Sequence, residues 1–190
     1  MKNGFLSCCL CLLLGACSLP YAVPEKDPAA GNQSTTRLLN IHIERWDEVR
    51  FSGLLALREQ GGGLYYALLD ATGVKLLEVE VASDGEYHLL HAKGALKESG
   101  LDGFLAEVLN RIYLREPATL PCVGSWFYEF CREEDADGKG WRKYGQTGSL
   151  QIWQVTAAAG PEQDTGSGVI IYRQPWLGIQ IYFEPIKRVQ

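Results

Sequence analysis

Six cysteines are the residues of this chain best suited to covalent chemistry. A thiolate is a strong nucleophile, so a cysteine can accept an acyl or alkyl group or join a second cysteine in a disulfide. Four of the six lie before residue 18, and the last of these, Cys17, follows an apolar segment. The other two, Cys122 and Cys131, lie close together in the second half of the chain. The sequence therefore indicates one kind of cysteine chemistry at its start and another in its folded part.

The start of the chain has the organisation of an export signal. Lys2 supplies a positive charge, the stretch from Phe5 to Leu14 is apolar, and small residues precede Cys17. This stretch is too short to span a membrane. Leu14-Gly15-Ala16-Cys17 resembles the lipobox of bacterial lipoproteins, in which the preceding peptide is removed, the cysteine is diacylated and the new N-terminus is acylated. We expect residues 1–16 to be a lipoprotein signal peptide and Cys17 the lipidated residue; the alternative is an ordinary secretory signal with a nearby cleavage site.

Residues 17–37 are expected to hold the lipidated cysteine and a flexible linker, because Ser18 to Thr36 is rich in Pro and polar residues and has no apolar period. An Asp directly after the lipidated cysteine would resemble the signal that retains enterobacterial lipoproteins in the inner membrane. Ser18 stands there instead, which implies the outer membrane, with the protein on its periplasmic face. Removal of Lys2 leaves 17 of the 18 basic side chains against 23 acidic ones, a formal charge of −6. We expect no nucleic acid partner.

The remaining segment, residues 38–190, is long enough for one domain with a substantial core. Alternating apolar and polar residues recur between turn signals such as Gly61-Gly62-Gly63 and Asp70-Ala71-Thr72-Gly73, which indicates an antiparallel meander. We expect about ten strands, at residues 39–44, 51–58, 64–69, 74–81, 86–92, 126–132, 140–144, 150–155, 169–172 and 179–183.

One segment between the fifth and sixth expected strands has a helical period instead. Its apolar residues form a single stripe, with Ser99 before it as a cap and Pro117 after it as a stop. We expect one long helix that packs in or across the concave face of the sheet. The stripe consists of Leu101, Phe104, Leu105, Val108, Leu109 and Ile112.

The fold class predicted from these elements is mainly β with one long helix, a curled antiparallel half-barrel, since a twisted sheet of about ten strands tends to curl. The chain resembles half-barrel lipoproteins of the outer-membrane lipoprotein receptor type (LolA/LolB-like). The resemblance is carried by two segments separated by a spacer, Phe51 to Arg58 and Leu68 to Leu77. More specifically, the chain is similar to an uncharacterised family of small bacterial lipoproteins found beside aryl polyene and fatty-acid-like biosynthesis genes.

The resemblance implies a concave apolar surface that shelters an acyl chain, a polyene lipid or another hydrophobic ligand. The receptor also engages the membrane through an apolar residue in a loop, whereas the corresponding turn here, Asp70 to Gly73, has no large apolar residue. The alternative for the expected lining residues is that they fill a core against the helix. These residues are Leu55, Leu57, Tyr66, Leu68, Leu77, Trp126, Tyr128, Phe130, Trp153, Ile171 and Tyr182.

Several other candidate sites carry less information. We expect Cys122 and Cys131 to form a disulfide, because an export compartment is oxidising; the alternative is two reduced thiols. Glu133 to Gly138 imitates the first half of a calcium loop, but the glutamate required at the twelfth position is replaced by Tyr144. We therefore expect a hydrated turn there, and no metal and no cofactor in the protein.

Catalysis is not expected, because no serine, histidine and carboxylate follow a known nucleophile pattern. The leading hypothesis is a non-enzymatic outer-membrane lipoprotein that binds or transfers a hydrophobic ligand in its concave surface. The second is an assembly lipoprotein that has a solid core and binds another envelope protein through a sheet edge. A lipid hydrolase is the third. An open hollow of roughly 300 Å³ would favour the first over the second.

Overall fold

A computed structural model describes residues 36–135, 138, 140–158 and 168–186. The expected signal peptide, Cys17 and all of the linker before Thr36 lie outside the described residues, as do Ala136 and Asp137 of the calcium-like segment. The described residues belong to one unit, Ser34–Gln190.

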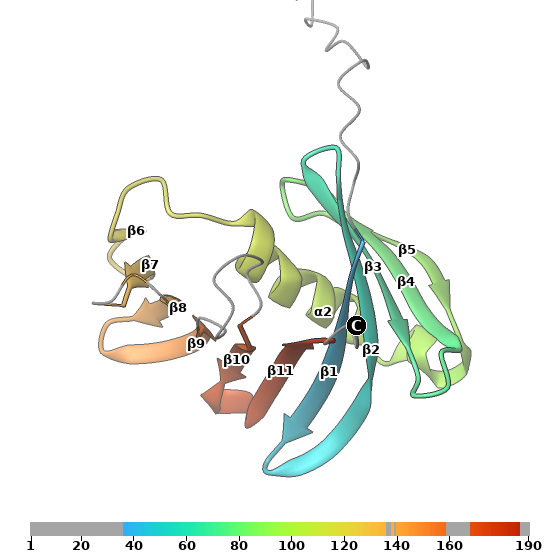
Figure 1. The fold of residues 1–190 in the computed structure, drawn as a ribbon. Coiled ribbons are helices and arrows are strands. Elements are labelled where there is room, and N and C mark those ends of the chain that lie inside the picture. The colour runs from blue at the N-terminus through green and yellow to red at the C-terminus, as the bar shows by residue number, and fades with distance from the viewer. Residues whose placement is uncertain (1–35, 136–137, 139, 159–167, 187–190) are drawn as a thin grey trace, which may run out of the picture. The chain divides into compact units, whose positions relative to one another are not determined.

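Eleven antiparallel strands form one sheet, with β5 and β6 at its edges, in the order β5-β4-β3-β2-β1-β11-β10-β9-β8-β7-β6. The sheet is curled and does not close (Figure 1), which confirms the predicted half-barrel class. The strands are β1 (Arg37–Arg45), β2 (Glu48–Gln60), β3 (Gly63–Leu69), β4 (Lys75–Val81), β5 (Tyr87–Ala92), β6 (Cys122–Gly124), β7 (Glu129–Glu134), β8 (Trp141–Thr147), β9 (Leu150–Ala157), β10 (Ile170–Gln174) and β11 (Ile179–Pro185).

The eleventh strand, β6, was not expected from the sequence. It has three residues, Cys122–Gly124, and is identified by its pairing with β7, in which Cys122 lies opposite Cys131. A strand of this length is too short to show an alternation of apolar and polar residues.

Side-chain alternation gives the sheet a core face and an outer face. In β1, Leu39, Ile41 and Ile43 are buried on the core face, while Asn40 and His42 point to the outer face. The core face is the concave one, and the helix lies across it (Figure 1).

The helix lies between β5 and β6, as predicted, but it is short rather than long. Helix α2 (Leu101–Leu109) has nine residues and continues as a π-helical segment, η2 (Asn110–Leu114). In that segment the backbone hydrogen bonds join residues five positions apart: the N–H of Arg115 donates to the carbonyl of Asn110 at 2.8 Å. Two 3-10 segments complete the described elements, η1 (Gly94–Glu98) and η3 (Pro175–Leu177).

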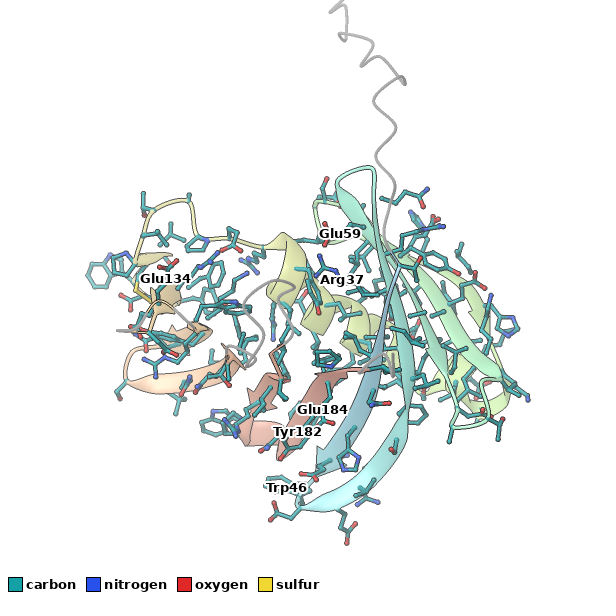
Figure 2. The ribbon with its side chains drawn as sticks, in the orientation of Figure 1. Arg37, Trp46, Glu59, Glu134, Tyr182 and Glu184 are labelled. Carbon is teal, nitrogen blue, oxygen red and sulfur yellow. A yellow bond between two sulfur atoms is a disulfide. The ribbon has the colours of Figure 1, made fainter. Side chains whose placement is uncertain are left out.

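Consecutive antiparallel strands place their connections alternately at two ends of the sheet. The β1–β2, β3–β4, β6–β7, β8–β9 and β10–β11 connections fall at one end, which we name the Trp46 end after the tip of the first hairpin. Strand β1 begins at the other end, with Arg37, and we name it the Arg37 end. Figure 2 shows Trp46 at the far end of β1 from the Arg37–Glu59 ion pair.

Candidate functional site

The concave surface on which a hydrophobic ligand was expected is filled by side chains. Seven of the eleven expected lining residues belong to one core cluster with helix α2, and none of them is more than 3% exposed. A water-sized space beside these side chains would leave them accessible area, so their burial indicates a solid interior. The seven are Leu55, Leu57, Tyr66, Leu68, Leu77, Phe130 and Trp153.

Helix α2 supplies the other half of this cluster through the predicted apolar stripe. Leu105, Val108, Leu109 and Ile112 are buried, and Leu101 and Phe104 pack against the cluster while partly exposed. The stripe was therefore predicted correctly, and it contacts the residues that the resemblance assigned to a ligand.

Polar contacts hold the helical segment to the sheet at both ends. At its start, the hydroxyl of Tyr66 donates to the carbonyl of Asp102 at 2.7 Å. At its end, the Nζ of Lys143 donates to the carbonyls of Ile112 and Arg115, each at 3.0 Å, and to Glu116 Oε1 at 2.7 Å. Lys143 itself is 1% exposed. Its ammonium satisfies carbonyls that the end of a helix leaves without partners.

Burial perturbs the ionisation of this contact. Burial lowers the pKa of Lys143, and the neighbouring Glu116 carboxylate opposes that change only in part. Burial alone would raise the pKa of Glu116, but hydrogen bonds from Lys143 and Arg132 leave its pKa below the ordinary value. The contacts of this pair with the carbonyls of the helical segment serve to position the helix.

One further expected lining residue, Tyr128, is partly buried at the margin of the core, where its hydroxyl accepts a hydrogen bond from Trp153 Nε1 at 3.0 Å. The structure places the last three outside the concave surface. Trp126 lies in the β6–β7 turn and is 96% exposed, because β7 begins only at Glu129. Ile171 and Tyr182 lie on the outer face, because Tyr172, Ile181 and Phe183 occupy the core face of their strands.

The outer face carries a polar cleft of about 630 Å³ across β11, β1 and β2. His42 contacts Glu44 at 3.2 Å and its ring lies 6.0 Å from that of Tyr182. Ser52 is opposite His42 in the strand register, but within the described part of the chain no hydrogen bond joins the two. A serine without a bonded base is not an activated nucleophile, so this group supplies no recognisable catalytic chemistry.

A second cleft, of about 460 Å³, lies at the Arg37 end of β7, β8, β9 and β10. Its lining combines Ile171 and Trp141 with the charged side chains Glu133, Glu134 and Arg142. The first cleft is lined mainly from the outer face, whereas the second includes Trp141, which packs against the margin of the core cluster.

The Trp46 end is a surface that the sequence analysis did not identify. Among the described residues, the four most exposed aromatic side chains are Trp46, Trp126, Phe127 and Trp176, and all four lie in connections at this end, whereas Tyr87, 43% exposed, lies at the Arg37 end. Hairpin tips are usually polar, so an indole at each of three tips is a departure that the printed sequence already contains. The topology was needed to show that the three tips share one end.

Cys122 and Cys131 are joined in a disulfide that links edge strand β6 to β7. No cluster of three His, Cys, Asp or Glu residues able to hold a metal occurs among the residues that the structure describes. In the same part of the chain, no helix is both long and apolar enough to cross a bilayer.

Comparison with known proteins adds no assignment, since no protein-family model and no curated protein matches the chain.

Proposed function

We propose that this protein is a non-enzymatic lipoprotein, tethered through Cys17 to the periplasmic face of the outer membrane, whose domain docks another envelope protein through a sheet edge. The lipobox supports the tether, because several acyl chains on one cysteine hold a protein to a bilayer far better than one chain does. The solid interior supports docking over carriage, and it is the observation on which the choice between the two depends.

A carrier would need helix α2 to leave the concave face. That movement would expose Leu105, Val108, Leu109 and Ile112 to water, at about 1.5–3 kcal/mol for each side chain. It would also break the contacts of Tyr66 and Lys143 at the two ends of the helix. The apolar concave face is therefore better explained as the core that fixes the sheet.

Edge strand β5 is the surface best suited to a protein partner. Its six residues leave one side of the backbone without a neighbouring strand, and Leu89 and Leu90 are exposed. The strand contains no Pro or Lys, the residues that commonly protect an edge from pairing. A partner strand could add its backbone hydrogen bonds there. The other edge, β6, has only three residues.

The first test measures whether the interior admits a ligand. Purified protein is titrated with a fluorescent fatty acid, beside a Leu105→Ala variant in which a buried side chain is removed. A solid core predicts no binding of the fatty acid by the native protein, while the small apolar cavity that truncation opens in the variant should admit a probe the size of benzene and no acyl chain. Stoichiometric binding by the native protein, or lipid that co-purifies with it, would instead favour a carrier.

The second test measures whether β5 contacts a partner. A photo-crosslinking amino acid at position 90 should give a discrete adduct in intact cells, whereas one at Thr156, on the outer face of β9, should not. Leu89→Lys on the edge strand should remove the adduct while the protein stays folded by circular dichroism. An adduct that survives this substitution would contradict docking through β5.

A further inference from the structure

We infer that the Trp46 end rests on the surface of a lipid bilayer, with the indoles of Trp46, Trp176 and Trp126 in its interfacial layer. The inference rests on the proposed function, in which the acyl chains on Cys17 hold the domain beside that bilayer. It adds a second, orientating contact made by the folded domain.

Exposure of the indoles is the first observation. Trp46 is 60% exposed, Trp176 58% and Phe127 77%, whereas Trp153, inside the sheet, is 1% exposed. At a membrane interface, an indole places its large apolar ring among the lipids and keeps its polar N–H in contact with water or headgroups. Tryptophan is enriched at membrane interfaces for this reason.

The backbone of the first hairpin is the second observation. Trp46 and Asp47 form its two-residue tip, and their φ angles are 54° and 62°. Both central positions of such a turn require positive φ, for which Asn and Gly are favoured. A bulky residue there is strained, and strain of this kind is retained where the side chain has a role at that site. The hairpin presents an indole where a small residue would fold better.

The two neighbouring tips hold each other in place. The N–H of Trp46 donates to the carbonyl of Gly178 at 2.8 Å, and a side chain at position 178 would collide with the Trp46 indole. Gly178 has a φ of 59° and ends the η3 turn that carries Trp176 and Leu177. The β1–β2 connection that carries Trp46 is therefore fixed to the β10–β11 connection that carries Trp176.

The β6–β7 turn adds the third indole at the same end of the sheet. Its four residues, Ser125–Tyr128, are closed by a hydrogen bond from the N–H of Ser125 to the carbonyl of Tyr128 at 2.9 Å. Trp126 and Phe127 occupy the two central positions and point away from the core.

The length of chain before the domain allows this orientation. The domain begins at the Arg37 end, one strand length from the indoles, and β1 spans about 30 Å at roughly 3.3 Å for each residue. The stretch from Ser18 to Thr36 can span up to about 65 Å, at no more than about 3.5 Å for each residue. A tether of this reach lets either end of the sheet face the bilayer that holds Cys17.

The spread of the aromatic tips over several connections favours a fluid surface over a rigid protein partner. The charges beside the Trp46 tip are mixed, with Arg45, Asp47, Glu48 and Arg50 in sequence around it. Attraction to anionic headgroups is therefore a minor component, and contact should survive high salt and occur on phosphatidylcholine.

The test uses the mature acylated protein in phosphatidylcholine vesicles whose acyl chains carry bromine, a quencher of tryptophan fluorescence. We expect quenching in the native protein. In a Trp46→Ser, Trp176→Ser double variant, Trp126 remains as the reporting fluorophore, and the ratio of docked to undocked domain measured from its quenching should fall about tenfold for each indole removed. Trp141→Phe is the matched control, because Trp141 lies at the Arg37 end.

The outcomes separate this inference from the proposed function. Flotation with vesicles and the mass of the N-terminal peptide report the anchor, and quenching reports the Trp46 end. Protein that is anchored but shows no quenching of its tryptophan fluorescence overturns the inference. Tryptophan emission that changes only when an envelope protein is added overturns it as well. If Cys17 carries no acyl chain, the proposed function fails, and quenching of unanchored protein mixed with the vesicles still decides the inference.

Discussion

Trp153 and Trp46 lie in the same sheet but in opposite environments. The Trp153 indole is buried against Phe130 and donates to the hydroxyl of Tyr128, while the Trp46 indole extends into solvent from a strained turn. The Trp153 indole contributes to the stability of the fold, whereas Trp46 lowers the stability of its own turn. The comparison shows that aromatic content alone does not identify a ligand site, because position in the sheet decides what each ring does.

The largest effect is expected when the same change, Trp to Ala, is made at a buried and at an exposed position. Trp153→Ala should lower the free energy of unfolding by about 3–5 kcal/mol, because it leaves a cavity in the core. Trp176→Ala should change it by less than about 0.5 kcal/mol, as expected for an exposed side chain. Urea denaturation of the two variants gives both values, and equal losses would contradict the assignment of the two regions.

An intermediate effect is expected at Lys143, which fixes the end of the helical segment. Lys143→Met retains the length of the side chain but leaves the carbonyls of Ile112 and Arg115 without their donor. We expect a loss of about 2–3 kcal/mol in the free energy of unfolding. Lys75→Met is the control, because Lys75 is an exposed lysine paired with a carboxylate.

The same contact should respond to acid. The pKa of Glu116 in the folded protein lies below its ordinary value of 4.5, so its contribution to stability is present above that value and is lost as the pH falls through the folded pKa. Stability measured from neutral pH down to about pH 3 should therefore fall less steeply in Glu116→Gln than in the native protein. A parallel decline in both proteins would count against the contact.

The smallest expected effect has the opposite sign. Replacing Trp46-Asp47 by Asn-Gly should raise the free energy of unfolding by about 1 kcal/mol, because both new residues accept positive φ readily. The same change should weaken contact with vesicles. A variant that is more stable and equally well docked would show that the Trp46 indole has no part in membrane contact.

Particular residues show where sequence reasoning succeeded. The alternation Leu39, Ile41, Ile43 identified a half-buried strand, and the stripe from Leu101 to Ile112 identified the helix and its buried side. Both patterns are local, because they depend only on the number of residues per turn or per pleat. Tyr182 was assigned to the wrong face even though its neighbours Gln180 and Glu184 are polar, a signal that alternation already contained.

Other features depended on contacts between distant segments. The alternation in β2, β3 and β9 required that Leu55, Tyr66 and Trp153 share one surface, but it left open whether a ligand or a helix covers them. The short helix end also escaped prediction, because the lysine that holds it comes from β8, distant in sequence.

The residues themselves determined that this chain forms many strands and one amphipathic helix, since each pattern arises from neighbours within a few positions. The tertiary structure alone decided that the concave surface is solid and that the connections carrying the indoles at positions 46, 126 and 176 fall at the same end of their strands. Those outcomes depend on strand order and curvature, which bring together segments more than a hundred residues apart in the sequence.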